Sequence, residues 1–496
     1  MRAISRRRAL LLGCLGAAAT VAGGAGLWWT ATSRFSPEAG GVLTEPEQLR
    51  STEGQLKVRL EASPVSVPLG GLRASVLGYN GSVPGPTLRV RGGDTLQIEL
   101  VNNLGVPTNL HVHGLHVSPQ GNGDNVFVMV PPGQSFSYEH RLPADHPPGT
   151  YWYHPHHHGM VADQVSAGLF GAIIVEEEDA PAVSRERTLV VSDLTLDGSG
   201  ALAEASPMDR MLGREGRLVL VNGHSSPEFS ARPGERERWR IVNTCVARYL
   251  RLRLDAQQLE LLGIDLSRFP TPRAVDEVLL APGNRADVLV TATAGVSALR
   301  SGYYNRGSMA GMMGRAGRGQ DAGGTGDLVL ATFSVSGTPA TEPPATEQPT
   351  PPPPVPARPA PEDLRTAVVA AHRELTLATG TGMGMGMGMM SFTINGRTFD
   401  PDRTDTVAAA GTVEEWTLLN PSPMDHPFHL HVWPMQVVEQ AGTAPDSVTL
   451  RDVVNIPANG QVKVRVRFTG FTGRSVYHCH ILDHEDQGMM GVIEVR

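Results

Sequence analysis

Ten of the seventeen histidines stand in four short clusters, and each cluster contains a His-X-His pair. Residues two apart on a strand face the same side, so each pair aims two imidazoles at one place. Imidazole is a common ligand of transition metals, and eight paired imidazoles are enough for several ions. The pairs are His111 and His113, His154 and His156, His429 and His431, and His478 and His480.

The last cluster also carries a thiol between its two imidazoles. On a strand, Cys479 faces away from His478 and His480, so one ion can bind the thiolate while others bind the imidazoles. Two imidazoles, one thiolate and a weak thioether are typical of a blue-copper electron-transfer site. Zinc is the alternative for a His-rich site, and the thioether and back-to-back imidazoles favour copper. The predicted ligands of this site are His426, Cys479, His484 and Met489.

An internal repeat must position these clusters. An Asn-Gly turn, an alternating strand and a closing Asn occur in the same order three times, starting at Asn80, Asn222 and Asn395. The starts lie 142 and 173 residues apart, a size that suits a β-sandwich. We therefore predict an all-β protein built from three Greek-key β-sandwich domains.

The repeat also predicts the domain boundaries. Eleven prolines between Thr338 and Pro361 make an extended linker that cannot join the interior of a sheet. We expect domains at 55–180, 185–335 and 362–496, with the linker at 336–361.

The second domain carries no histidine cluster. The clusters follow the strand-closing Asn102 in the first copy and Asn420 in the third, but no histidine follows Asn243 until His372. We therefore expect the metal ions to lie where the first and third domains meet. The second domain is then a spacer or a wall that faces the substrate.

Charge and cysteine content exclude other classes. A net charge of −8 argues against a nucleic-acid binder, which needs a basic surface. Cys245 has no partner for a disulfide and is interpreted as a buried small hydrophobe. Residues 1–36 resemble a twin-arginine export signal, with an uncleaved membrane anchor as the alternative. We expect the body of the protein to be periplasmic or extracellular.

All four clusters, in order and spacing, resemble those of the three-domain multicopper oxidases. The resemblance covers essentially the whole mature chain, and the likeness is to bacterial laccases and metallo-oxidases with a Met-rich segment. It implies cupredoxin-like domains and four copper ions: one type 1, one type 2 and two type 3. It gives the type 1 copper His426, Cys479, His484 and Met489; the type 2 copper His111 and His429; and the type 3 pair His113, His154, His156, His431, His478 and His480.

The resemblance implies that four one-electron oxidations at the type 1 copper are coupled to reduction of dioxygen to water. Glu485 matches the family's acid beside the last type 1 histidine. Asp124 is the candidate for a second acid, although Gly121 to Gly123 shift its spacing. A solvated loop carboxylate is the alternative for both.

The resemblance favours phenols and aromatic amines as reductants, and Cu(I), oxidised for copper tolerance, is the alternative. Thioethers are soft ligands for Cu(I), but Met also fills irregular apolar gaps. A copper carrier without oxidase activity belongs to another class, and the eight paired imidazoles argue against it. We expect a monomer, because one chain contains every ligand. The Met-rich segments contain Met309, Met312 and Met313, and Met383, Met385, Met387, Met389 and Met390.

Overall fold

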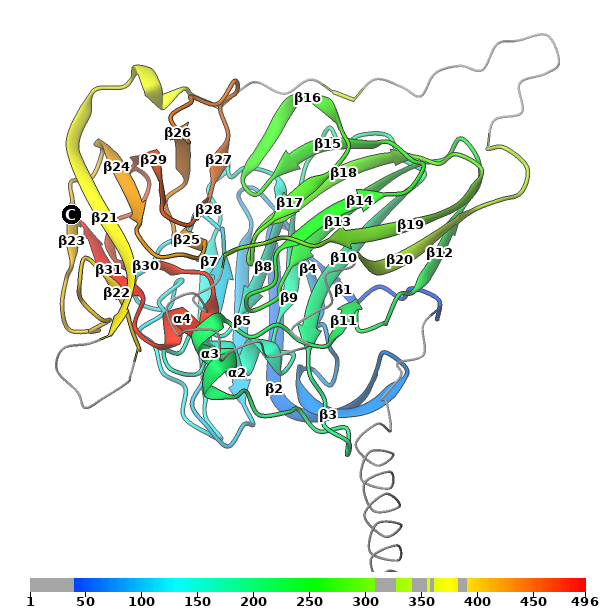
Figure 1. Ribbon diagram of the computed structural model, residues 1–496, viewed down its shortest axis with the longest axis horizontal. Coiled ribbons are helices and arrows are strands. Elements are labelled where there is room, and N and C mark those ends of the chain that lie inside the picture. The colour runs from blue at the N-terminus through cyan, green and yellow to red at the C-terminus, as the bar shows by residue number, and fades with distance from the viewer. Residues whose placement is uncertain (1–39, 308–326, 341–354, 357–360, 382–389) are drawn as a thin grey trace, which may run out of the picture. The chain divides into compact units, whose positions relative to one another are not determined.

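Strands dominate the computed structural model (Figure 1), and the all-β prediction is confirmed. The structure describes residues 40–307, 327–340, 355–356, 361–381 and 390–496. The predicted leader at 1–36, part of the linker and every residue of the Met-rich segments except Met390 lie outside the described residues. Within the described ranges, the helices are too short or too polar to cross a bilayer.

The first sandwich has nine strands in two sheets. Its strands are β1 (Gln48–Arg50), β2 (Gln55–Leu69), β3 (Leu72–Tyr79), β4 (Thr87–Arg91), β5 (Thr95–Asn102), β6 (His111–His113), β7 (Ser135–Arg141), β8 (Gly149–His154) and β9 (Gly171–Glu176). The sheets have the orders β3-β2-β5-β7 and β1-β4-β9-β8-β6. Alternate apolar residues of β5, such as Leu96 and Ile98, pack into a core shared with Ile173 of the other sheet.

In its described residues the second sandwich has eleven strands. They are β10 (Arg185–Leu194), β11 (Leu218–Val221), β12 (Glu228–Ala231), β13 (Arg236–Asn243), β14 (Leu250–Leu254), β15 (Leu259–Ile264), β16 (Ser267–Val275), β17 (Val278–Leu280), β18 (Arg285–Thr291), β19 (Gly295–Gly302) and β20 (Leu328–Val335). The sheets have the orders β11-β10-β13-β18-β15-β16 and β12-β20-β19-β14-β17. Trp239 and Phe333 meet in the core between them.

The third sandwich repeats this plan. Its strands are β21 (Val369–Thr381), β22 (Met390–Ile394), β23 (Thr406–Ala408), β24 (Val413–Asn420), β25 (His426–Leu430), β26 (Met435–Gln440), β27 (Leu450–Arg451), β28 (Val453–Ile456), β29 (Gly460–Arg467), β30 (Gly473–Cys479) and β31 (Met490–Val495). The sheets have the orders β22-β21-β24-β29-β26-β27 and β23-β31-β30-β25-β28. The short helices are α2 (Val161–Ser166), α3 (Pro207–Leu212), η2 (Leu364–Thr366) and α4 (Leu482–Asp486).

The Asn-Gly turns have the same conformation in all three sandwiches. Both residues of each turn have positive φ, from 50° to 53° at Asn and from 73° to 80° at Gly. Such two-residue turns suit tight β-hairpins, and Asn and Gly tolerate this conformation best. They begin at Asn80, Asn222 and Asn395.

The closing asparagines also make the same hydrogen bonds in each copy. Nδ2 of Asn102, Asn243 and Asn420 donates to backbone carbonyls on two different segments, and Oδ1 accepts the N–H two residues later, at 2.8–3.1 Å. Each buried carboxamide therefore fixes the loop after its strand. In the first and third copies that loop leads directly to His111 and His426.

The second and third sandwiches share a buried polar triad. In each, a Trp Nε1 donates to a Glu two residues earlier at 2.8 Å, and an Arg from the neighbouring strand donates to that Glu from Nε and Nη2 at 2.6–2.8 Å. The paired charges satisfy the carboxylate in the sheet interior. The triads are Arg187–Glu237–Trp239 and Arg373–Glu414–Trp416.

Removal of the third-domain triad's indole is expected to destabilise the fold. Trp416 is fully buried, so Trp416→Ala leaves a cavity and is expected to lower the free energy of unfolding by about 3–5 kcal/mol. Urea denaturation followed by fluorescence measures this loss. The matched control is Val368→Ala, where the side chain is 90% exposed and the expected change is below about 0.5 kcal/mol. Equal effects of the two substitutions would contradict the assignment of Trp416 to the core.

Candidate metal centre

The histidine pairs come from two pairs of neighbouring strands. In the first sandwich, β6 and β8 pair with His111 opposite His154. In the third, β25 and β30 pair with His429 opposite His478. The register of the backbone thus places two histidines of each sandwich side by side.

Most of the His-X-His pairs were expected on strands, but only the first pair lies wholly within one. His156, His431 and His480 come one or two residues after the ends of β8, β25 and β30. The strands fix the first histidine of each pair, and the backbone that leaves the strand directs the second. All eight imidazoles nevertheless meet in one buried cluster.

The eight imidazoles form a compact group with almost no exposed surface. The ring of His111 stacks on His431 at 3.9 Å between centroids, and His113 stacks on His429 at 4.0 Å. Both stacks join a histidine of the first sandwich to one of the third. Three sets of three imidazoles have ligand atoms within 4.8 Å of one another: His111, His113 and His154; His111, His429 and His431; and His156, His431 and His478.

Several ring nitrogens in this group have no hydrogen-bond partner. Among the described residues, both nitrogens of His480 and Nε2 of His154 are buried and unpaired. Leaving a buried polar atom unsatisfied costs about 1–3 kcal/mol, so the cluster as folded needs another partner. A metal ion accepts such nitrogen lone pairs, and the donor set therefore fits bound metal.

The protonation state of the cluster also suits a metal. Burial lowers the pKa of every one of the eight imidazoles, and neighbouring imidazoles lower most of them further. The pKa of His154 falls to about 3 and that of His478 to about 4. The rings are thus neutral at pH 7, which is the form that binds a cation.

The predicted thiolate site is assembled on the opposite face of β30. Sγ of Cys479 lies 3.4 Å from Nδ1 of His426 and 3.8 Å from Nδ1 of His484. The other nitrogens of these rings are held by Ser422 Oγ at 2.8 Å and by the Met211 carbonyl at 3.2 Å. Both Nδ1 atoms therefore face the sulfur, which leaves one soft and two imidazole donors around a common point.

Met489 lies beside these three residues. Its carbonyl accepts the Cys479 N–H at 3.0 Å, and its N–H donates to the His484 carbonyl at 2.9 Å. The side chain is fully buried in the same core as Cys479. The backbone thus holds Met489 next to Cys479 and His484.

Cys479 joins the two groups of ligands through one peptide unit on each side. His478 and His480 belong to the imidazole cluster, whereas the sulfur faces His426. Nδ1 of His478 also lies 3.0 Å from the Cys479 carbonyl. This hydrogen bond gives a second connection from Cys479 to the ring, besides the covalent backbone.

Both predicted acids lie against the imidazole cluster and are fully buried, not solvated. Asp124 accepts from His111 Nδ1 at 2.9 Å and from the Val112 N–H at 3.0 Å. Burial raises the pKa of Asp124 to about 8. The shifted spacing after the first cluster therefore does not remove Asp124 from the site.

Glu485 lies on the other side of the cluster. Its carboxylate is 3.4 Å from Nδ1 of His478 and 3.7 Å from Nε2 of His156. Burial and the charge of Asp486 raise the pKa of Glu485 well above its usual value. The protonated form of Glu485 is thus favoured more than that of an exposed glutamate.

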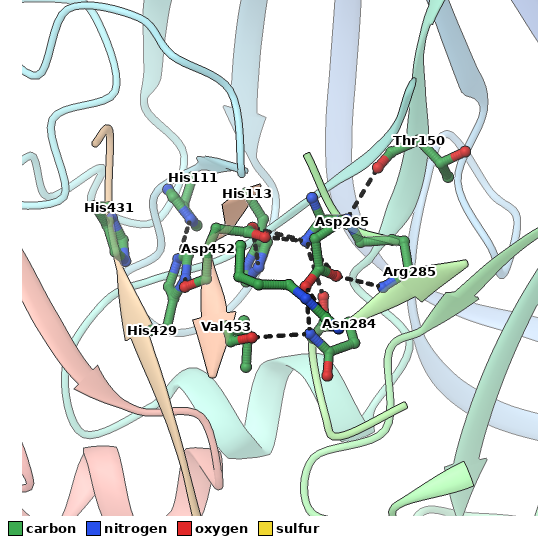
Figure 2. Close-up of polar contacts among 12 residues, drawn as sticks. His111, His113, Thr150, Asp265, Asn284, Arg285, His429, His431, Asp452 and Val453 are labelled. Carbon is green, nitrogen blue, oxygen red and sulfur yellow. Dashed lines mark hydrogen bonds and ion pairs between the residues drawn. The ribbon is translucent and has the colours of Figure 1, made fainter. Parts of the chain in front are cut away.

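Sequence reasoning missed Asp452, which lies between β27 and β28. Its carbonyl accepts from His429 Nδ1 at 2.8 Å, and Oδ2 lies 3.0 Å from His113 Nε2. Figure 2 shows this carboxylate between the imidazoles and Arg285. Neither neighbour of Asp452 in the sequence, Arg451 or Val453, is a histidine or a cysteine. The sequence therefore contains no pattern that assigns Asp452 to the site.

The segment around α3 covers the imidazole of His484. Besides the Met211 carbonyl on His484 Nε2, Arg214 pairs with the buried Asp483 at 2.6 Å. His484 has no exposed surface, whereas Met208 on α3 is 47% exposed. An electron donor in solution therefore meets α3 before it meets the ring.

Comparison with known proteins agrees with this arrangement. Three family models described as multicopper oxidase match residues 62–180, 185–316 and 371–496. The structure of a Campylobacter jejuni multicopper oxidase, described as a metallo-oxidase, superposes with a TM-score of 0.79 at 30% identity over 92% of this chain and 96% of that one. A Bacillus stratosphericus laccase is 26% identical over 480 residues, 84% of this chain and 90% of the laccase. The cell division protein FtsP of Rahnella sp. is 29% identical over 464 residues, 91% of this chain and 92% of FtsP.

The buried imidazoles predict that the metal-free protein loses stability in mild acid. In the unfolded state these rings are exposed to water and take up protons below about pH 6.5. Each ring then lowers the free energy of unfolding by up to about 1.4 kcal/mol for every pH unit below this value. Buried carboxyls with raised pKa values, such as Asp124, act in the opposite direction but are fewer. Urea unfolding of the metal-free protein is expected to show a free energy lower by several kcal/mol at about pH 5 than at about pH 8. Equal or greater stability at about pH 5 would contradict neutral burial of the cluster.

Proposed function

The chain belongs to the multicopper oxidase family and is a copper-dependent oxidoreductase that uses dioxygen, and we propose that it couples four one-electron oxidations of a reductant to reduction of dioxygen to water. The observation that carries the proposal is the position of Cys479. Its sulfur belongs to a His-Cys-His group, and its two neighbours belong to the eight-imidazole cluster.

We assign four copper ions to these groups. The type 1 copper would be held by His426, Cys479 and His484, with the thioether of Met489 as a further, weak ligand. The unpaired nitrogens of His154 and His480 support metal in the imidazole cluster, and the stacked rings from two sandwiches supply both type 2 and type 3 ligands. The type 2 ligands are His111 and His429, and the type 3 ligands are His113, His154, His156, His431, His478 and His480.

The residues of the chain set the route and the geometry of the reaction. When bound, the type 1 copper accepts single electrons and the other three reduce dioxygen. Cys479 and the hydrogen bond from His478 connect the two sites. Ser422 and the Met211 carbonyl hold the type 1 imidazoles, and Asp124 orients His111 in the same way.

Water formation requires protons at the imidazole cluster. Glu485 and Asp124 are the two buried carboxyls predicted from the sequence, and they contact different imidazoles. Burial raises the pKa of both groups, that of Asp124 to about 8, so each keeps its proton to a higher pH than an exposed carboxyl does. We propose that they deliver protons to oxygen during its reduction.

The test is a pair of cysteine variants. Cys479→Ser removes the thiolate whose neighbours in the chain belong to the imidazole cluster, so we expect loss of the blue thiolate absorption and at least a hundredfold lower oxygen uptake with a reducing dye. Cys245→Ser is the matched control, because Cys245 is equally buried but contacts the Val191 carbonyl in the second sandwich. Metal analysis of the unsubstituted protein is expected to give four coppers per chain. About one copper without oxygen uptake would favour a carrier, and no copper at all would favour a non-catalytic role.

Phenols and aromatic amines are the first candidate reductants. The overall pattern of ligands resembles laccases, and one relative that matches most of this chain is named a laccase. The type 1 imidazole of His484 lies directly beneath α3. Electrons from an aromatic donor bound on this surface have a short path to the site.

Cu(I) is the second candidate, and the cover over His484 favours it. A bulky phenol cannot touch a ring with no exposed surface, whereas Met208 presents an exposed thioether on the covering helix. Thioethers bind Cu(I), and the Met-rich segments add more of them. The Campylobacter jejuni relative described as a metallo-oxidase is consistent with this candidate.

Substitution of the alternating methionines separates the two candidates. Met→Leu at 383, 385, 387 and 389 removes soft ligands while conserving side-chain volume. If Cu(I) is the substrate and docks on this segment, kcat/KM for Cu(I) is expected to fall about tenfold or more while turnover of a phenolic dye stays unchanged. Unchanged Cu(I) kinetics would remove this segment from cuprous oxidation.

We also propose that the protein acts outside the cytoplasm as a monomer. The resemblance of residues 1–36 to a twin-arginine signal supports export. Both ligand-bearing sandwiches belong to one chain, so no second copy is needed to complete the copper centre.

A further inference from the structure

We propose that Arg285 is a positioning residue for the trinuclear copper centre and acts through Asp452. The inference rests on the copper centre proposed above. The second sandwich supplies none of the twelve candidate ligands. Through Arg285, however, it positions the imidazoles of the oxygen site. Figure 2 shows Asp452 between Arg285 and the imidazoles.

Arg285 is fully buried and contacts all three sandwiches. It begins β18 in the second sandwich, and its Nε donates to the carbonyl of Thr150 in the first at 2.9 Å. Its Nη1 lies 2.7 and 2.6 Å from the two carboxylate oxygens of Asp452 in the third. One side chain therefore fixes Asp452 relative to both other sandwiches.

Asp452 in turn contacts two ligands with different assigned roles. Its carbonyl holds Nδ1 of His429, which is assigned to the type 2 copper. Its Oδ2 lies 3.0 Å from Nε2 of His113, which is assigned to the type 3 pair. The hydrogen bond to His429 and the close carboxylate at His113 restrict the positions of both rings, and loss of such a supporting partner weakens metal binding about 10- to 100-fold.

Arg285 and Asp452 are packed tightly against the backbone at Gly114. A Cβ at Gly114, the residue after His113, would lie only 2.7 Å from both Arg285 Nη2 and Asp452 Oδ2. Gly114 has a φ of +87°, so glycine is also required by its backbone conformation. The backbone that carries His113 is thus packed directly against the ion pair, and a displaced carboxylate moves the ligand.

Arg285 is further fixed from within its own sandwich. Its backbone N–H donates to Asp265 Oδ1 at 2.9 Å, and Asn284 Nδ2 donates to Asp265 Oδ2 at 2.8 Å and to the Val453 carbonyl at 3.2 Å. These bonds hold the start of β18 against the residue that follows Asp452. The guanidinium is therefore presented by a rigid strand end.

The alternative is that the ion pair only joins the sandwiches. Substitution of any buried arginine that pairs with a buried carboxylate destabilises the fold, because the carboxylate is left without a partner. A joining role predicts that type 1 and trinuclear copper are lost together on unfolding. A positioning role predicts selective damage to the trinuclear copper in protein that remains folded.

The experiment compares Arg285→Gln with Arg187→Gln. Arg187 is the matched control, since it is a buried arginine of the same sandwich held by two bonds to Glu237 and contacts no candidate ligand among the described residues. Copper content after dialysis against a chelator, the type 2 paramagnetic resonance signal and the blue absorption are measured in the folded fraction. For Arg285→Gln we expect at least tenfold weaker retention of trinuclear copper and an altered type 2 signal, with the blue absorption intact. Arg187→Gln is expected to retain all four coppers.

Four coppers with an unchanged type 2 signal in Arg285→Gln would overturn the proposal, as would equal loss in both variants. If Arg285→Gln does not fold, Arg285→Lys and Asp452→Asn decide. Lysine keeps the positive charge but cannot donate to both the Thr150 carbonyl and the Asp452 carboxylate. A type 2 signal that is altered in Arg285→Lys and in Asp452→Asn therefore supports positioning. An unaltered signal in both contradicts it. If the unsubstituted protein binds no copper, the proposed function fails first, and the two failures are thereby distinguished.

Discussion

The structure depends on the burial of eight neutral imidazoles at the junction of two β-sandwiches. Stacked pairs such as His113 on His429 bring together rings from segments more than three hundred residues apart. The unpaired nitrogens of His154 and His480 make this packing unfavourable until a cation binds. Folding and metal binding are therefore linked, and copper stabilises the contact between the first and third sandwiches.

The fold and much of the site could be predicted from the sequence because both are periodic. The alternating residues of β5 and the Asn-Gly turns belong to a pattern that occurs three times, and the first histidine of each His-X-His pair lies on a strand. The structure also brings Asp124 to His111, which the shifted spacing had left open. Whether each imidazole binds its assigned copper stays a prediction, as do the domain boundaries.

Other parts could not be predicted, because they depend on contacts between distant segments. The imidazole His484 lies on α4 under the Met211 carbonyl, and no local pattern relates these two residues. Asp452 contacts His113 across more than three hundred residues. Arg285 looks like an ordinary charged residue at the start of a strand, and only the packing of three sandwiches shows that it is buried.

The asparagine that closes each copy's strand has a consequence for how this chain can change. After Asn243 the loop carries no ligand, yet its Val246 carbonyl accepts the N–H of Leu482 at the start of α4, and Arg306 donates to the Ala247 carbonyl. The second sandwich thus keeps the loop of the repeat without its histidines, and this loop packs against α4, which carries His484. Substitutions in this loop therefore change the surroundings of His484 while all twelve candidate ligands stay in place.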